Sequence, residues 1–260
     1  MNFTQIALTA QPEKIVRFNL LDWCINENAL LPESAWWWIS YIVGVLACIA
    51  VPYVLGSINP AILISRKMFN ADIREHGSGN AGSTNMLRTY GKKAAGLTFA
   101  CDFLKAIVAC LWGLIVWEMN GLALAGFFVI FGHMYPIFEK FKGGKGVACL
   151  AAVVLFTSIF TNNLIPFLPL AFIFLTIIFL VVIIGTQYVS MASVTGAFLY
   201  PVILHSFSDP EQAGLCVAMA ALSACFVIYK HKENLKRIYN RTESKLDFKK
   251  KSKDNKGDQT

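Results

Sequence analysis

The sequence predicts an all-α polytopic membrane protein with about seven transmembrane helices, its N-terminus outside and its C-terminus in the cytoplasm. Hydrophobic residues make up 56% of the 260 residues and charged residues only 15%, whereas a soluble domain carries about 25% charged residues. The apolar residues gather into long runs, and the basic residues gather between alternate runs. Both patterns are typical of a chain that crosses a bilayer several times.

Residues 1–35 precede the first long run and lack the basic segment that opens a secretory signal. Apolar residues such as Ile15, Phe18 and Trp23 allow a short helix lying at the membrane interface. A weakly ordered extension is an equal alternative. We therefore treat 1–35 as a separate N-terminal extension, and the sequence does not decide between these two structures.

Seven apolar runs follow and define a membrane domain over 36–246. They span 36–62, 94–117, 121–138, 147–161, 164–188, 190–206 and 213–230. Several are shorter than the roughly 20 residues of a straight span. Short helices still cross when they are tilted or packed against protein.

Charge orients these runs. Basic residues concentrate in 66–93, in 139–145 and in 230–260, where there are 11 Lys or Arg and 5 Asp or Glu. By the positive-inside rule these segments are cytoplasmic. The loop at 188–193 should share that side, yet it has no basic residue. The polar, lysine-rich end, 247–260, predicts a disordered tail.

Composition also limits the function classes. The basic tail lies beside a span, where it more commonly faces anionic lipid than nucleic acid, and no nucleic-acid recognition fold has room outside the spans. The seven cysteines show no metal-binding spacing, so no metal and no cofactor are expected. Oligomeric state stays open, with a monomer allowed.

The first polar segment on the cytoplasmic side is GSGNAGSTN at 77–85, followed by an arginine three residues later. Glycines let backbone amides approach an anion, and hydroxyl, amide and guanidinium groups add donors. A polar turn that caps the next helix is the alternative. The candidate residues are Gly77, Ser78, Gly79, Asn80, Thr84, Asn85 and Arg88.

The second segment is KGGKG, comprising Lys142, Gly143, Gly144, Lys145 and Gly146, at the start of an apolar run. Glycines at a helix start, flanked by lysines, suit an anion held by amides and the helix dipole. An ordinary basic loop is the alternative. The upstream GHMYP carries a single histidine near a span end, and we interpret it as structural.

The third segment is HKENLKR, followed by a carboxylate. Spacings of three place His231, Asn234 and Arg237 on one helical face, with Glu243 beyond. A basic flank after the last span is the alternative. Within the spans the only charges are Asp102 and Lys105, which lie three apart and favour a pair, either functional or interfacial.

These three segments face one side of the membrane, which favours an enzyme acting on a phosphorylated, partly lipidic substrate. In this order, GSGNAGSTNMLR, GHMYP with KGGKG, and HKENLKRIYNRTE closely resemble the three signatures of the acyl-phosphate:glycerol-3-phosphate acyltransferase family. The resemblance covers about 55–246. Departures from the usual pattern fall at Ala81, Ser83, Cys149, Arg241 and Thr186-Gln187.

The resemblance implies a seven-helix protein of the bacterial inner membrane, with its active site near the cytoplasmic face. It implies acyl transfer from acyl phosphate to the 1-hydroxyl of glycerol 3-phosphate, yielding lysophosphatidic acid and phosphate, without metal or acyl-CoA. By motif, Ser78 and Arg88 contact substrate phosphate and hydroxyl groups, and Lys145 grips glycerol 3-phosphate. His231 and Asn234 line that site, and Glu243 supports it.

For the mechanism, we expect Arg88 and Lys145 to clamp glycerol 3-phosphate and the amides of residues 143–146 to hold acyl phosphate. The proton goes to a substrate phosphate oxygen, with His231 as the alternative base. The HxxxxD motif of other glycerolipid acyltransferases is absent.

Two other functions compete with acyl transfer. A transporter of a phosphorylated metabolite or lipid would use the basic segments as a vestibule. A CDP-alcohol phosphotransferase would need an aspartate cluster for metal ions, and the spans and inner loops offer only Asp72 and Asp102.

Overall fold

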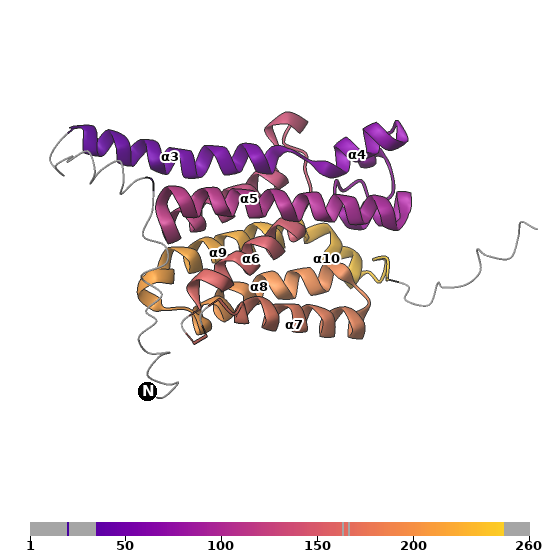
Figure 1. Cartoon of the computed structure of the whole chain (residues 1–260). Coiled ribbons are helices and arrows are strands. Elements are labelled where there is room, and N and C mark those ends of the chain that lie inside the picture. The colour runs from indigo at the N-terminus through magenta and orange to yellow at the C-terminus, as the bar shows by residue number, and fades with distance from the viewer. Residues whose placement is uncertain (1–19, 21–34, 163, 166, 247–260) are drawn as a thin grey trace, which may run out of the picture.

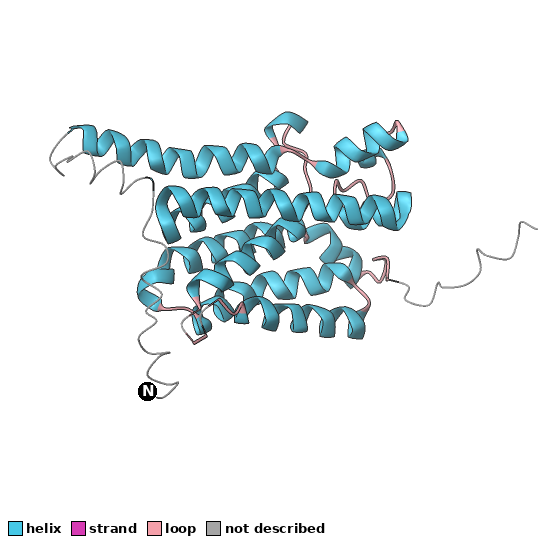
Figure 2. Cartoon of the chain, in the orientation of Figure 1, coloured by secondary structure: helices cyan, strands magenta, loops and turns pink. Residues whose placement is uncertain are grey.

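The computed structural model describes Leu20 and residues 35–162, 164–165 and 167–246, and this part of the chain is a helical bundle without a strand (Figures 1 and 2). The all-helical prediction is confirmed. The predicted extension and tail lie outside the described residues, apart from Leu20 and Ala35. The helices are α3 Ala35–Ser57, α4 Pro60–Phe69, α5 Ser83–Met134, α6 Val147–Thr161, α7 Leu170–Thr186, α8 Val189–Phe207, α9 Pro210–Lys230 and α10 Lys232–Tyr239, with short 3-10 turns η3 Ile73–Glu75 and η4 Ile137–Glu139.

The long helix α5 is a helical hairpin. Trp117 and Glu118 have non-helical backbone angles, and Gly91 breaks the helix once more near its start. A Cβ atom on Gly113 would lie 2.2 Å from the carbonyl oxygen of Gly121, so the arms 92–116 and 119–134 meet backbone to backbone. The arms correspond to two of the predicted spans, 94–117 and 121–138.

Among the described residues, four stretches are long and apolar enough to cross a membrane, and two shorter apolar helices accompany them. The four are Ala35–Phe69, Ser83–Glu139, Val189–Phe207 and Ala213–Lys230, and the shorter two are Val147–Thr161 and Leu170–Thr186.

Two predicted spans are not single uninterrupted helices. Within the run 36–62, α3 ends at Ser57, because Asn59 accepts a hydrogen bond from the Ile62 amide at 3.2 Å and starts a new helix with Pro60 at its first position. The run 164–188 becomes helical only at Leu170. Before it, the Asn162 side chain donates to the Ile165 carbonyl at 2.8 Å and holds the chain in a turn.

Small residues let α3 and the second arm of α5 approach closely. A Cβ atom on Gly56 would lie 2.3 Å from the Val129 carbonyl oxygen, and one on Gly132 would lie 2.3 Å from that of Tyr53. Such contacts are typical of helix packing in lipid, where van der Waals fit replaces hydrophobic burial. The outer faces carry exposed apolar side chains, among them Leu104, Val108, Ile115, Ile177, Val181 and Ile184.

The three polar segments meet at one end of the bundle. The loop 76–82 leads into α5, the loop 140–146 leads into α6, and residue 231 joins α9 to α10. Figure 1 shows α4 and α10 at this same end, where α8 also begins. Chain segments more than 150 residues apart in sequence, such as those of Arg88 and Ser244, contact each other there.

Candidate active site

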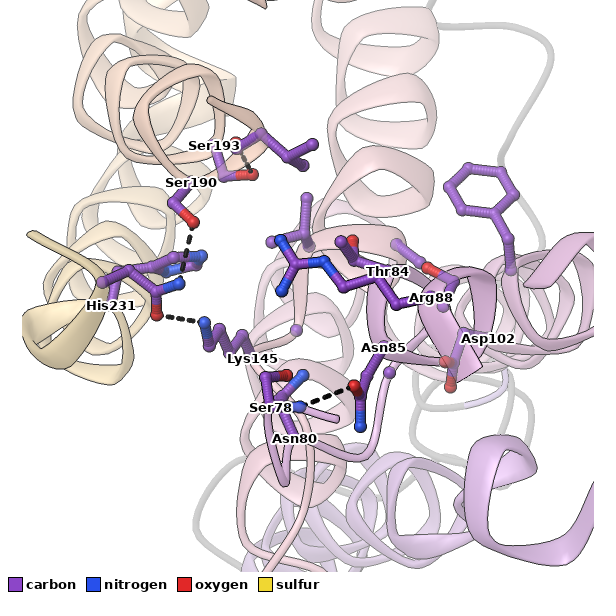
Figure 3. Close-up of a pocket in the computed structure, with 18 of the residues that line it drawn as sticks. Ser78, Asn80, Thr84, Asn85, Arg88, Asp102, Lys145, Ser190, Ser193 and His231 are labelled. Carbon is purple, nitrogen blue, oxygen red and sulfur yellow. Dashed lines mark hydrogen bonds between the residues drawn. The ribbon is translucent and has the colours of Figure 1, made fainter. Parts of the chain in front are cut away.

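The polar segments surround one cavity of about 220 Å³, to which α5, α6, α7, α8 and the α9–α10 region all contribute (Figure 3). Ten predicted site residues line it: Ser78, Asn80, Thr84, Asn85, Arg88, Lys145, Gly146, His231, Asn234 and Glu243. Of the other predicted residues, Gly79, Lys142 and Gly143 border a second, neighbouring depression. Gly77, Gly144 and Arg237 line neither cavity but contact residues that line the first.

Asn85 folds the first loop around itself. Its Oδ1 accepts from the Ser78 amide at 2.9 Å, and its Nδ2 donates to the carbonyls of Ile73 and His76 at 3.2 and 2.9 Å. Gly77 has φ +58°, and a Cβ atom there would lie 2.3 Å from Asn85 Oδ1. Asn85 and Gly77 therefore shape the loop, whereas Ser78 remains exposed at the cavity wall.

Backbone amides of the loop 140–146 already donate hydrogen bonds within the protein. Those of Gly143 and Gly144 donate to the backbone carbonyls of Met134 and His133, at 3.3 and 3.2 Å. A Cβ atom at either position would collide with His133, at 2.0 Å from its carbonyl oxygen and 2.2 Å from its Nε2. Both amides thus have backbone partners in the substrate-free structure, and the expectation that the amides of residues 143–146 hold acyl phosphate stays a prediction. The glycines permit close packing on His133, and of this glycine set only Gly146 lines the cavity.

Lys145 lines the cavity (Figure 3). Its Nζ donates to Asn234 Oδ1. Burial lowers the pKa of this amine from 10.5 to about 8; Glu243 opposes the shift, and the cations Arg237, Arg88 and Lys230 add to it. These four cations lie near the carboxylate of Glu243, so this part of the cavity suits an anion.

Glu243 organises the third segment. Its Oε1 accepts from Ser190 Oγ and Asn234 Nδ2, both at 2.6 Å, and its Oε2 accepts from Arg237 Nε at 2.8 Å. Burial raises the pKa of Glu243, but the hydrogen bonds from Ser190, Arg237 and Asn234 outweigh that effect and lower it overall. The carboxylate thus stays charged and orients the Asn234 amide toward Lys145.

A left-handed residue brings Glu243 into place. Arg241 has φ +58°, and the Thr242 amide donates to the Arg237 carbonyl at 2.8 Å, which closes the end of α10. Glycine adopts such angles without steric cost, whereas Arg241 holds them at some cost in strain. The turn returns the chain toward α10, where Glu243 meets Arg237.

His231 is buried and neutral. Its Nδ1 lies 2.7 Å from the Val227 carbonyl, which can only accept, so Nδ1 carries the proton and Nε2 holds the lone pair. Burial lowers the pKa of His231 from 6.5 to about 4, helped by the charge of Lys145 and opposed by the Val227 hydrogen bond and Glu243. At neutral pH Nε2 of the ring can therefore act as a hydrogen-bond acceptor for a ligand in the cavity that His231 lines.

Arg88 is exposed and extends from α5 across the cavity toward Lys145 (Figure 3). Its Nη2 reaches the Ser244 carbonyl only at 3.5 Å, so the guanidinium retains donors for a ligand. Phe99, Phe179 and Val189 form an apolar part of the same cavity wall. The cavity therefore combines an anion site with apolar surface.

Comparison with known proteins identifies the family. A model described as glycerol-3-phosphate acyltransferase matches residues 46–241. The chain belongs to this family. A glycerol-3-phosphate acyltransferase of Bacillus velezensis is 40% identical over 200 residues, covering 76% of this chain and 95% of the relative. The enzyme of Bacillus subtilis is 38% identical over 199 residues, with coverage of 76% and 95%.

Solved structures of the same family agree in fold. Crystal structures of PlsY (YgiH), an integral membrane glycerol 3-phosphate acyltransferase, match in a glycerol 3-phosphate form and a lysophosphatidic acid form. Their TM-scores are 0.69 and 0.67 and their identities 31% and 30%, each covering 79% of this chain and 96% of the other. The family resemblance seen in the sequence motifs is therefore confirmed.

Three serines that line this acyltransferase cavity were not among the predicted site residues: Ser83, Ser190 and Ser193. Ser190 accepts from Asn234 Nδ2 at 2.9 Å, donates to Glu243 and lines the cavity. It follows Val189 at the start of α8, in the loop that looked anomalous because it lacks basic residues. The signal that the sequence offered was a serine at the start of an apolar run, in a loop without basic residues.

Proposed function

We propose that this protein transfers an acyl group from acyl phosphate to the 1-hydroxyl of glycerol 3-phosphate, producing lysophosphatidic acid and phosphate for phospholipid synthesis. The observation that carries the proposal is the cavity in which Lys145 and Arg88 adjoin the apolar side chains Phe99 and Phe179. Such a site fits a phosphate on one side and an acyl chain on the other. Membership of the acyltransferase family supports the same chemistry.

Arg88 and Lys145 bind the phosphate of glycerol 3-phosphate in this proposal. The guanidinium offers two parallel donors and the ammonium a point charge. Ser78 and Thr84, on the wall that also carries Arg88, offer hydroxyl donors to the second phosphate. Asn234 and Glu243 orient Lys145, so the cations are arranged before substrate arrives.

The reaction forms one bond and breaks one. The 1-hydroxyl oxygen attacks the acyl carbonyl carbon, and the bond from that carbon to the phosphate oxygen breaks, so phosphate leaves with the electron pair. The hydroxyl proton passes to a phosphate oxygen. His231, with its pKa near 4, holds a proton weakly and serves to accept a hydrogen bond that orients the hydroxyl.

Replacing His231 with glutamine tests this division of roles. We expect the KM for glycerol 3-phosphate to rise while kcat falls less than about tenfold, because an amide oxygen can still accept the hydroxyl hydrogen bond. Steady-state kinetics with each substrate varied in turn provide the measurement. A collapse of kcat by about 10³-fold with unchanged substrate binding would instead identify His231 as the base.

We further propose one membrane domain over 36–246 with seven crossings of a bacterial inner membrane, an outside N-terminus and a cytoplasmic site. The two arms of α5 add a crossing to the long apolar stretches, and α6 and α7 are short apolar helices. Basic residues near the cavity end support the cytoplasmic assignment, among them Arg66, Lys67, Lys92, Lys93, Lys140 and Lys142.

The experiment that tests the function measures phosphate release from palmitoyl phosphate by purified protein, with and without glycerol 3-phosphate. We expect release that depends on glycerol 3-phosphate and yields one lysophosphatidic acid per phosphate, and none with palmitoyl-CoA as donor. Activity with palmitoyl-CoA alone would contradict the proposed donor. Inert, folded protein with both donors would contradict acyl transfer, and uptake of glycerol 3-phosphate into vesicles would then support transport.

A further inference from the structure

A buried ionic cluster lies beside the cavity, made by Asp102 and Lys105 from the first arm of α5 and His133 from the end of the second. The predicted pair of Asp102 and Lys105 is confirmed, with Nζ and Oδ1 2.8 Å apart. His133 Nδ1 lies 3.0 Å from the same Oδ1. Asp102 and His133 are 1% and 3% exposed, and both line the cavity. The functional roles proposed above use none of the three.

The oxygens around Lys105 assign the protons of this cluster. Lys105 Nζ lies 3.0 and 2.6 Å from the carbonyl oxygens of Gly56 and Ile58, 2.8 Å from Asp102 Oδ1 and 3.1 Å from His133 Nδ1. The three oxygens can only accept, so they take the three ammonium protons. His133 Nδ1 therefore carries its own proton and donates it to Asp102. The ligand atoms of Asp102, His133 and Cys149 lie within 4.8 Å of one another, but the Lys105 ammonium already supplies the positive charge there.

The cluster contacts the loop that carries Lys145. The His133 carbonyl accepts the Gly144 amide, and the neighbouring Met134 carbonyl accepts that of Gly143. The imidazole packs so closely on Gly144 that a Cβ atom there would lie 2.2 Å from Nε2, and 2.6 Å from the Ala81 carbonyl of the first loop. The orientation of His133 thus sets the position of the residue preceding Lys145.

We propose that Asp102, Lys105 and His133 are positioning residues that fix the second loop against α3 and α5 and so place the Lys145 amine for glycerol 3-phosphate. This inference rests on the proposed function. Asp102 holds the imidazole in one orientation, and Lys105 anchors Asp102 to the end of α3 through two carbonyls. The ring then packs against Gly144. The hydrogen bonds from the Gly143 and Gly144 amides to the Met134 and His133 carbonyls hold the loop at the end of α5.

Two substitutions of His133 provide the test. His133→Leu removes the donor to Asp102, whereas His133→Asn keeps an amide donor close to the position of Nδ1. We expect His133→Leu to raise the KM for glycerol 3-phosphate at least tenfold with kcat changed less than threefold. The reason is that a displacement of the Lys145 amine by about 1 Å can reduce the efficiency of the reaction by up to about 10²-fold. The KM for palmitoyl phosphate should stay near the wild-type value, and His133→Asn should recover most of the loss.

Thr98→Val is the matched control. Thr98 lies on the same arm of α5, is fully buried and donates to the Ala94 carbonyl at 2.8 Å, outside the cluster. Thr98→Val should leave the KM values for glycerol 3-phosphate and palmitoyl phosphate unchanged, at a melting temperature comparable to that of His133→Leu. A general packing defect would instead affect Thr98→Val and His133→Leu alike.

The outcomes separate this inference from the proposed function. Inactive wild-type protein would contradict the function itself. If the wild-type protein is active and folded His133→Leu has an unchanged KM for glycerol 3-phosphate, only the positioning role is overturned. An equal rise of this KM in His133→Asn and His133→Leu would overturn it as well. Should His133→Leu fail to fold, Asp102→Asn decides: an unchanged KM overturns the inference, and a KM raised at least threefold supports it.

Discussion

Replacing Lys145 with methionine is expected to abolish acyl transfer and yet raise the melting temperature of the substrate-free protein. Loss of the amine removes a central cation of the anion site, which typically costs about 10²–10³ in rate for a key electrostatic group. The gain in stability has a separate cause. The folded state lowers the pKa of Lys145 from 10.5 to about 8, chiefly by burial, so holding the proton at pH 7 destabilises the fold.

The sign of this effect gives a pH test. Between pH 8 and 10.5 the unfolded chain binds more protons at Lys145 than the folded protein does. The contribution of Lys145 to stability therefore rises with pH across that window. Melting temperatures of wild-type and Lys145→Met protein, measured in one detergent, should differ most near pH 7 and converge toward pH 10.

Lys140→Met is the matched control, since Lys140 lies in the same segment but is exposed and borders the second depression. It should keep wild-type activity and wild-type melting behaviour. Equal loss of activity in both variants would mean that general positive charge matters and not the site. More than about a tenth of wild-type activity in Lys145→Met would contradict its role in the anion clamp.

The sequence predicted well what depends on local spacing. Asp102 and Lys105 lie three apart on a helix, so their pairing follows from helix geometry. The i, i+3 pattern of His231 and Asn234 similarly placed both side chains at the cavity. Bringing the three motifs together followed from charge, because the positive-inside rule assigns all of them to one face.

Contacts between distant segments could not be predicted in this way. Gly143 and Gly144 were predicted to hold an anion because glycine exposes its amide, and in the substrate-free structure the carbonyls of Met134 and His133 accept those amides. That pairing depends on where α5 ends in space, which no local pattern specifies. Ser190 was missed for the same reason, since its partners Asn234 and Glu243 lie 44 and 53 residues away.

Hydropathy located the helices better than their ends. An average over a window does not register a single capping residue, so the break at Asn59 and Pro60 was included in an apolar run. The turn before Leu170 was included as well. Both breaks follow from asparagine side chains that hydrogen-bond to nearby backbone, a signal that was present in the sequence at Asn59-Pro60.

Glu243→Gln is expected to shift the pH dependence of catalysis as well as its rate. The carboxylate raises the pKa of Lys145 toward the wild-type value of about 8, so its loss should lower that pKa further. A neutral amine does not attract phosphate. In wild-type protein kcat/KM for glycerol 3-phosphate should therefore fall above about pH 8, and in Glu243→Gln the fall should begin at a lower pH.

The rate should fall too, because glutamine cannot satisfy all three donors. Ser190 and Asn234 donate to one carboxylate oxygen and Arg237 to the other, whereas a Gln amide offers one oxygen and a nitrogen that itself donates. One donor is left unpaired, and Asn234 loses its fixed orientation toward Lys145. We expect kcat/KM to drop by about 10–100-fold at pH 7, on the order of 1.4–2.7 kcal/mol.

Glu233→Gln makes the same change of charge and shape on the exposed face of α10, ten residues earlier. This variant should keep the wild-type kcat/KM at pH 7, and its kcat/KM should begin to fall at the same alkaline pH as in the wild-type protein. The comparison isolates the carboxylate in contact with the site, because surface charges are screened by solvent. An alkaline limb at the same pH in Glu243→Gln and wild type would show that Lys145 is not the titrating group, and the assignment of the anion clamp would then fall to Arg88 alone.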